Sequence, residues 1–232
     1  MSERRVLAVD VGGSHVKALV AGVDEPRRFS TGKRLSAQKM VEKVSALAES
    51  WDYDVVSVGV PAQVRSGRVV HEPVNLGKGW VGFDYEKAFG RPTVVVNDAV
   101  MQALGSYEGG RMLFLGLGTG LGSAMIVDGV VEPMELGHLP FRKKTYEDYV
   151  GERGLEHLGR KRWRKLVVEV VEYFIAALDP DYVVLGGGNV DDLAELPSRA
   201  RRGDNLNAFA GGFRLWDEPY RRQAVGLRRA IS

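Results

Sequence analysis

The chain has 232 residues, and its 32 basic and 30 acidic side chains leave a formal net charge of +2. Hydrophobic residues make up 44% and charged residues 27%, which is typical of a folded protein and too apolar for a disordered one. Cys is absent, which excludes disulfides, a thiolate nucleophile and any zinc or iron–sulfur site with Cys ligands. Gly reaches 29 residues, so many positions favour tight turns or close backbone approach.

The N-terminus leads directly into an apolar strand pattern without signal-peptide organisation, and no apolar run is long enough to cross a membrane. We therefore expect a cytoplasmic protein without a membrane partner. Basic residues are concentrated in two segments, 142–165 and 199–232, each with a net charge of +5. Such segments suit a polyanionic ligand, and they suit the solvated faces of helices equally well.

The first half of the chain alternates strand and helix patterns. Apolar runs predict strands over 5–9 and 16–20, separated by a Gly turn. Apolar residues at helical spacing predict a helix over 36–50, with Ser36 as its N-cap. Two further strands are predicted over 55–60 and 93–96.

The second half repeats this pattern. Strands over 112–115 and 123–127 again flank a Gly turn, and an amphipathic helix over 163–178 is stopped by Asp179-Pro180. A buried strand over 182–185 then runs into three glycines. The repeat predicts an α/β fold of two similar lobes, with a ligand in the cleft between them. We place the lobes at 1–108, joined by a returning segment 218–232, and at 109–217.

The Gly turns are candidate phosphate cradles. The sequence contains no P-loop motif. The turn that begins at Gly116 does not fit a dinucleotide-binding fingerprint, because the third Gly is missing and a strand rather than a helix follows. A hairpin turn of Gly and Ser/Thr can still present backbone N–H groups to phosphate oxygens. Asp10, just before the first turn, could hold Mg²⁺ directly or through water. A plain tight turn explains this short motif equally well.

Five segments carry a stronger signal through their order and spacing. They read LAVDVGGSHVKALVAG from Leu7, VVVNDA from Val94, LGLGTGLG from Leu115, ELGH from Glu135 and VVLGGGN from Val183. In this arrangement, from about Leu7 to Asn189, the chain resembles the ROK family of sugar kinases. The resemblance implies the actin-like ATPase (ribonuclease H-like) fold, and within the family it is nearest to the polyphosphate glucokinase branch.

The resemblance implies a sugar site. Asp98 matches the family's catalytic base, which accepts the proton of the attacking sugar hydroxyl. A strand-end Asp is also a good helix cap, so capping is the alternative for Asp98. Asn97, Glu135 and His138 match positions that hydrogen-bond sugar hydroxyls, and we expect Asn75 to join them.

Zinc is excluded in the form that the family uses. In many members the His at position 138 joins three Cys in a zinc site, and this chain has no Cys. His138 is then left with a sugar-binding role, against the alternative of a structural His. Glu152 aligns loosely with the family's second sugar-binding Glu, because the segment that would fix the register is missing.

The resemblance also implies a donor site. Its residues fall in three groups: Gly12, Gly13, Ser14 and Lys17 match the first phosphate motif, Gly118, Thr119 and Gly120 the second, and Gly186, Gly187 and Gly188 the turn beside adenosine. Lys17 could equally be an exposed strand charge, and the three glycines an ordinary strand-to-helix connection. Pro61-Ala62 departs from the family's usual Pro-Gly.

Together these features predict a Mg²⁺-dependent hexose kinase, with glucose as the first candidate for the acceptor. The donor is expected to be ATP, inorganic polyphosphate or both, and the family suggests a homodimer. Other sugars, such as mannose or an N-acetylated amino sugar, are the alternatives within this class. A non-catalytic sugar or nucleotide sensor is the alternative outside it. Nucleic acid is not expected as a partner, because the first strand starts at Arg5 with no helix-turn-helix before it.

Overall fold

The computed structural model describes residues 4–204 and 206–224, so the end of the predicted returning segment, 225–232, lies outside the described residues. The chain divides into two compact units, Met1–Gly105 with Ala208–Ser232 and Ser106–Asn207. We call them the first and the second unit. The chain returns to the first unit at Ala208, earlier than the expected 218, because Phe209 packs in a cluster with Ala8 and Leu19 of the first sheet.

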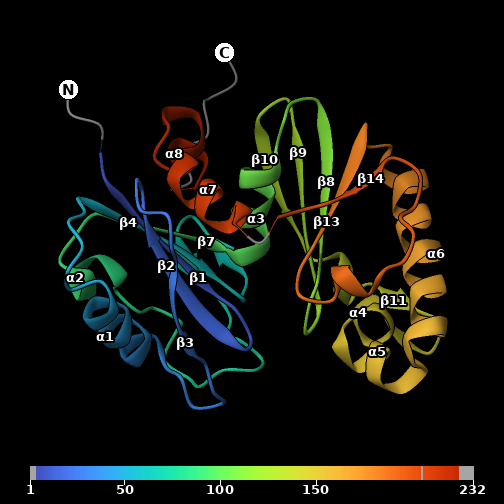
Figure 1. The fold of residues 1–232 in the computed structure, drawn as a ribbon, viewed down its shortest axis with the longest axis horizontal. Coiled ribbons are helices and arrows are strands. Elements are labelled where there is room, and N and C mark those ends of the chain that lie inside the picture. The colour runs from blue at the N-terminus through green and yellow to red at the C-terminus, as the bar shows by residue number, and fades with distance from the viewer. Residues whose placement is uncertain (1–3, 205, 225–232) are drawn as a thin grey trace. The chain divides into compact units, whose positions relative to one another are not determined.

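The first unit is built on a five-stranded sheet in the order β3-β2-β1-β4-β7 (Figure 1). The three strands β1, β2 and β3 are antiparallel neighbours, whereas β1, β4 and β7 run parallel. Their bounds are β1 Val6–Val11, β2 His15–Val20, β3 Arg27–Ser30, β4 Val55–Val60 and β7 Thr93–Asn97. All six residues of β1 and of β4 are buried, as their apolar runs predict.

The second unit repeats the same topology. Its sheet has the order β10-β9-β8-β13-β14, with antiparallel pairs from β10 to β8 and parallel pairs from β8 to β14. The bounds are β8 Arg111–Leu117, β9 Leu121–Val127, β10 Val130–Met134, β13 Tyr182–Gly186 and β14 Ala200–Arg202. Matching order and directions confirm the prediction of two similar α/β lobes.

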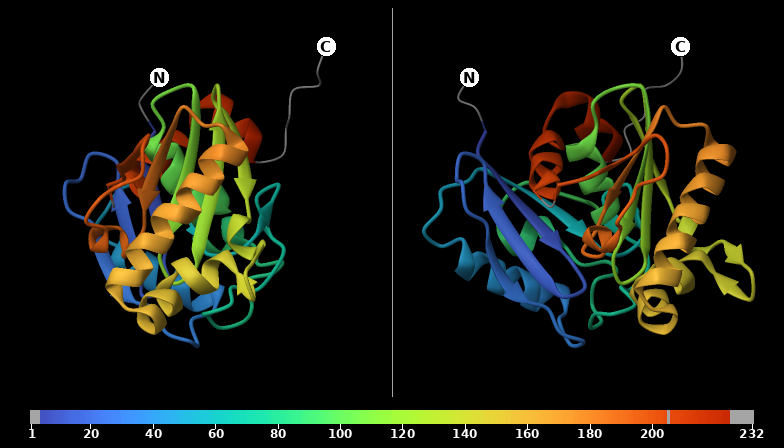
Figure 2. Two further views of the ribbon diagram at one scale, coloured as in Figure 1. Left: turned by 90° about the vertical axis from the view of Figure 1, so that its right-hand side faces the viewer. Right: turned by 45° about the vertical axis from the view of Figure 1, so that its right-hand side comes forward.

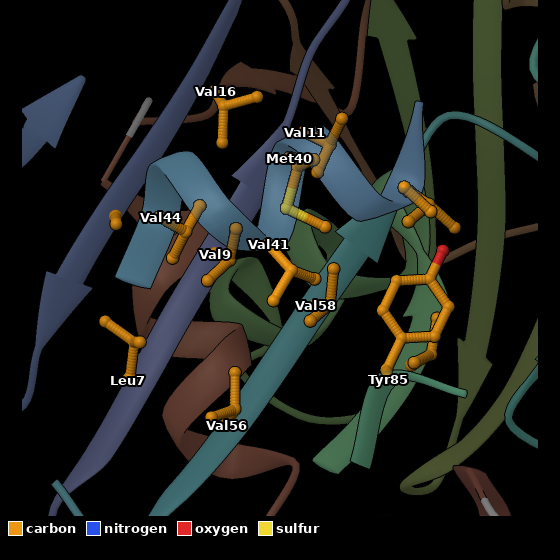
Figure 3. Close-up of a cluster of buried hydrophobic side chains, with 14 of the residues drawn as sticks. Leu7, Val9, Val11, Val16, Met40, Val41, Val44, Val56, Val58 and Tyr85 are labelled. Atoms are coloured by element: carbon orange, nitrogen blue, oxygen red, sulfur yellow. The ribbon is translucent and has the colours of Figure 1, made fainter. Parts of the chain in front are cut away.

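Helix α1 (Ala37–Leu47) covers one face of the first sheet. It begins where the sequence predicts, because the Ser36 side chain accepts a hydrogen bond from the Lys39 backbone N–H at 3.4 Å. Figure 3 shows Met40, Val41 and Val44 directed at the apolar side chains of β1 and β4. This face of the sheet is therefore core, and its opposite face is left for other contacts.

Helix α6 (Arg160–Leu178) runs across the second sheet (Figure 2). It starts slightly before the predicted residue 163 and ends at Leu178 as predicted, with Asp179 in the left-handed region at φ 45°. Trp163 is fully buried, and its indole N–H donates to the Val150 carbonyl at 3.0 Å. This bond joins α6 to the segment that carries part of the candidate site.

Helix α3 (Asp98–Ser106) is held close to α7 (Asn207–Arg214) in the first unit. A Cβ at Gly211 would lie 1.7 Å from the Met101 carbonyl oxygen, so only Gly permits this approach. The fully buried Ser57 of β4 donates to the Gly212 carbonyl and accepts from the Trp216 indole N–H. The returning segment thus fixes the helix that starts at Asp98.

The remaining elements are short and were not expected from the sequence. They are α2 Tyr85–Phe89, α4 Tyr146–Val150, α5 Glu152–Leu158, α8 Glu218–Ala224, the 3-10 turns η1 Leu136–His138 and η2 Val190–Asp192, and the two-residue strands β5 Val64–Arg65, β6 Arg68–Val69, β11 Pro140–Phe141 and β12 Lys144–Thr145.

Candidate active site

The β1–β2 hairpin of the first unit carries the first predicted phosphate turn. The Gly12 N–H donates to the His15 carbonyl at 2.9 Å, which closes the turn. Thr31, which follows β3, braces it from the side: its hydroxyl donates to the Gly13 carbonyl and its N–H to the Ser14 carbonyl. Gly13 and Ser14 remain exposed, so the turn is ordered and still open to a ligand.

Asp10 lies on the sheet directly beside Lys17, its register partner across β1 and β2. Burial raises the pKa of the Asp10 carboxyl from 3.8 to about 6, and the Lys17 charge opposes that rise. A desolvated carboxylate next to a phosphate turn gains from a cation, and Mg²⁺ is commonly held by one carboxylate, waters and substrate phosphates. The Asp10 side chain therefore fits the predicted Mg²⁺ role.

Asp98 begins α3 immediately after β7, and the structure assigns the capping role to its neighbour. The Asn97 side-chain oxygen accepts from the backbone N–H groups of Ala99 and Val100, at 2.9 and 3.4 Å. The Asn97 amide also donates to the Ala62 carbonyl at 3.1 Å. Asn97 is thus the helix cap, and one of its amide hydrogens remains for a ligand. The half-buried Asp98 carboxylate is not needed as a cap.

The loop that carries Asn75 is organised by Glu72, a residue that the sequence analysis did not single out. The Glu72 carboxylate accepts from the backbone N–H groups of Gly79, Trp80 and Val81 at 3.1, 3.0 and 3.5 Å. Trp80 is fully buried, and its indole N–H donates to the Leu35 carbonyl at 3.2 Å. Asn75 itself is exposed at the surface of this anchored loop.

The second unit holds the other two Gly turns against one another. Asn189 joins them, because its N–H donates to the Leu117 carbonyl at 3.0 Å and its side-chain amide to the Gly118 carbonyl at 3.3 Å. Gly187 has φ 87°, and a Cβ there would lie 2.4 Å from the Leu117 carbonyl oxygen. The predicted phosphate turn 118–120 and the predicted adenosine turn 186–188 therefore form one rigid group.

Glu135 and His138 lie beside this group, together with Glu147 of α4. His138 Nδ1 is 3.5 Å from a Glu135 carboxylate oxygen, and His138 Nε2 is 3.9 Å from one of Glu147. The Glu147 carboxylate also touches Gly120, where a Cβ would lie 2.6 Å from its Oε2 atom. Two carboxylates and an imidazole thus lie together, with Glu147 in contact with the second phosphate turn, and they offer several donors and acceptors for sugar hydroxyls.

The sequence predicts Glu152 as the second sugar-binding Glu, whereas the second carboxylate near His138 in the structure is that of Glu147. Glu152 begins α5, and its backbone N–H donates to the Gly118 carbonyl at 2.9 Å. Its contact with the phosphate turn is thus made by the main chain. A usable signal for Glu147 was the capping box of α4, in which Thr145 and Asp148 bond reciprocally and fix where that helix starts.

Four of the basic residues in segment 142–165 are already engaged. Arg142 pairs with Glu169 at 3.2 Å and Arg153 with Asp148 at 3.5 Å. Arg160 pairs with the Asp192 carboxylate at 3.0 Å, and the Arg164 guanidinium donates to the Asp192 carbonyl. The exposed cations left on this part of α6 are Lys161, Arg162 and Lys165. Helix burial and ion pairing therefore account for part of the charge that the sequence shows there.

Among residues 4–204 and 206–224, no cluster of three or more His, Asp or Glu side chains is arranged to hold a metal ion. None of the helices in that same part of the chain is long and apolar enough to cross a membrane.

Comparison with known proteins decides the family. The family model described as "ROK family" matches residues 6–154, which include the first phosphate turn, Asp98 and the Glu135–His138 loop. The chain belongs to the ROK family. The resemblance seen in the sequence is thereby confirmed.

Two relatives that are similar in sequence are named as kinases. A glucokinase of Pyrobaculum calidifontis is 29% identical, covering 84% of this chain and 84% of its own length. A polyphosphate glucokinase of Mycobacterium tuberculosis is 26% identical, covering 81% of this chain and 78% of its own length. This ROK protein therefore resembles hexose kinases over most of both chains.

Solved structures show the same fold. The crystal structure of inorganic polyphosphate/ATP-glucomannokinase from Arthrobacter sp. matches with a TM-score of 0.80 at 24% identity, over 90% of this chain and 97% of that chain. A ROK family glucokinase from Streptomyces griseus matches at 0.71 and 17% identity, over 90% and 97%. A ROK family transcriptional regulator matches at 0.72 and 13%, so the fold also serves proteins named as regulators. The fold is that of the ROK sugar kinases, as expected.

Proposed function

We propose that this ROK protein is a hexose kinase that phosphorylates the 6-hydroxyl group of glucose. The observation that carries the proposal is the position of Asp98, which follows β7 while Asn97 takes over the capping of α3. The kinase names of the similar proteins, at 29% and 26% identity, support the same activity. Asn75, Asn97, Glu135, His138 and Glu147 are proposed as the groups that bind the sugar, with Glu152 kept as the alternative from the sequence.

In the proposed reaction, Asp98 accepts the proton of the 6-hydroxyl as that oxygen attacks the terminal phosphorus of the donor. The new O–P bond forms while the bond to the rest of the donor breaks, and the shortened donor leaves with the electron pair. Gly12, Ser14, Lys17 and the turn 118–120 bind and orient the donor phosphates. Mg²⁺ held through Asp10 would offset the charge that develops on the transferred group.

The donor in this proposal is ATP, inorganic polyphosphate or both. Polyphosphate appears in the names of the Mycobacterium tuberculosis and Arthrobacter proteins, and both nucleotide and polyphosphate offer a chain of phosphates to the same Gly turns. The homodimer and the cytoplasmic location remain predictions from the sequence and the family.

A parallel assay tests the proposal. Glucose, mannose and N-acetylmannosamine are each offered with ATP and with polyphosphate, and the phosphorylated sugar is measured directly. We expect turnover of glucose with at least one donor, and its loss when Mg²⁺ is chelated. Sugar binding without turnover for every pair would instead support the alternative of a non-catalytic sensor.

A further inference from the structure

Two cations lie side by side on the first sheet, next to the first phosphate turn. The register pairs Asp10 with Lys17 across β1 and β2, and Lys17 with Arg28 across β2 and β3. Side chains of directly paired residues project to the same face of a sheet. Lys17 and Arg28 therefore form a row that leads from Asp10 toward β3, the edge strand of the sheet. We call Lys17 and Arg28 the basic row.

The basic row lies on the face of the sheet that α1 does not cover. Val16 and Phe29, the neighbouring register pair, pack against the core under α1, so the residues that alternate with them project the other way. Arg27 also belongs to the α1 side: it donates to the Leu47 carbonyl, bonds Ser50 and lies over Trp51 at 4.1 Å. Lys17 is half-buried and Arg28 is exposed.

The chain that leaves β3 adds two more cations near the same turn. Thr31 is bonded to Gly13 and Ser14, and the next residues form a tight turn closed by the Leu35 N–H on the Gly32 carbonyl at 2.9 Å. Lys33 and Arg34 stand at the tip of that turn, exposed to solvent. Lys33 and Arg34 therefore lie within three residues of Thr31, which is bonded to the phosphate turn.

None of these four cations forms an ion pair in the described part of the chain. Asp10 is the register partner of Lys17, and it lies at the inner end of the row. Like charges in directly paired positions are destabilising. A basic residue on an edge strand can prevent edge-to-edge association. That explanation covers Arg28 but not Lys17, which lies one strand further in.

We propose that the basic row, with Lys33 and Arg34, is a binding site for the part of a linear phosphate chain that extends beyond the phosphate turn. The inference rests on the proposed function, because it takes the turn 12–14 as the place where the donor phosphates bind. Its ligand class is an inorganic polyphosphate longer than a triphosphate. A long chain extends past Lys17 to Arg28, Lys33 and Arg34, whereas a short one is held at the turn and Lys17.

Binding measurements without sugar test the site. Dissociation constants for tripolyphosphate and for long-chain polyphosphate are measured by calorimetry on the whole protein, at about 0.15 M salt. The variants are Arg28→Gln and the double variant Lys33→Gln with Arg34→Gln. The matched control is Arg27→Gln, which removes the same charge from the same strand on its other face.

We expect the wild-type protein to bind the long chain more tightly than tripolyphosphate. Arg28→Gln should weaken long-chain binding about tenfold, equivalent to about 1.4 kcal/mol, while tripolyphosphate binding changes much less. The double variant should behave in the same way, and Arg27→Gln should leave the preference for the long chain intact. Thermal unfolding of each variant checks that the fold is retained.

If Arg28→Gln and Arg27→Gln weaken the binding of long-chain polyphosphate equally, the proposed site is wrong, because the effect is then one of general charge. A wild-type protein that does not prefer the long chain would overturn the site as well. The parallel sugar assay separates this failure from that of the proposed function. Phosphoryl transfer with no role for Arg28 overturns the site alone, and an Arg28-dependent preference without transfer to any sugar overturns the kinase proposal alone.

Discussion

The two β-hairpins that carry the phosphate turns occupy equivalent places in the two sheets, yet they differ in chemistry. One step before the turn, the first hairpin pairs Asp10 with Lys17, and the second pairs Gly116 with Gly122. The same ladder position thus holds two opposite charges in one unit and no side chains in the other. The shared topology gives both hairpins the same backbone geometry. The different side chains at matched positions give the two turns different chemistry.

The division continues beyond the hairpins. In the first unit, β7, the neighbour of β4 in the sheet, leads into Asp98 and the start of α3. In the second unit, the turn 118–120 is surrounded by Glu147, by the main chain of α5 and by Asn189. The comparison predicts that proton transfer and cation binding belong to the first unit, whereas the second unit mainly holds and orients ligands.

The strongest test of this division is Asp98→Asn. If Asp98 takes the proton, the rate of phosphoryl transfer should fall by about 10²–10⁴-fold, because the amide cannot act as a base. Glucose binding, measured by calorimetry, should persist. Asp24→Asn, a change of the same kind at an exposed residue, is the control. Near-normal turnover in Asp98→Asn would show that Asp98 is not the catalytic base.

Asp10→Asn should stabilise the fold while it impairs activity. The folded-state pKa of about 6 lies above the ordinary 3.8, so folding favours the protonated carboxyl and stability falls as pH rises through this window. Above about pH 6, the ionised Asp10 lowers the free energy of unfolding by at most about 3 kcal/mol. Urea unfolding of both proteins at about pH 4 and about pH 7.5 should show a gain for Asp10→Asn only at the higher pH. An equal difference at the two pH values would contradict the raised pKa.

The matched pair Glu147→Gln and Glu152→Gln tests the second unit. Glu147 lies at both His138 and Gly120, so its loss should raise KM for glucose by about 10–100-fold, the effect of a charged hydrogen bond. Glu152→Gln should change KM little, since its bond to Gly118 comes from the main chain. Steady-state kinetics decide between the two, and the reverse result would restore the expectation from the sequence.

Much of the fold was readable in the sequence, because buried parallel strands are continuous apolar runs and the Gly turns between them repeat. The edge strands β3 and β10 were missed, since their alternating, partly exposed residues lack such runs. Glu147 was missed for another reason. Its position depends on where a five-residue helix starts, and that is decided by the Thr145 and Asp148 hydrogen bonds rather than by any periodicity.

Glu72→Gln should give the smallest effect. One amide oxygen replaces a carboxylate that accepts from three backbone N–H groups, so the loop around Asn75 loosens by about 1 kcal/mol. We expect KM for glucose to rise a few-fold with kcat nearly unchanged. Glu49→Gln, at an exposed helix end, serves as the control. An unchanged KM would show that the loop does not contribute to sugar binding.

The second unit begins at Ser106 and ends at Asn207, and these two residues are hydrogen-bonded at 2.9 Å through their side chains. A segment whose two ends meet behaves as an insert that leaves its host chain almost uninterrupted. Residues 106–207 are therefore a natural piece to express separately, or to rejoin in permuted order with new termini elsewhere.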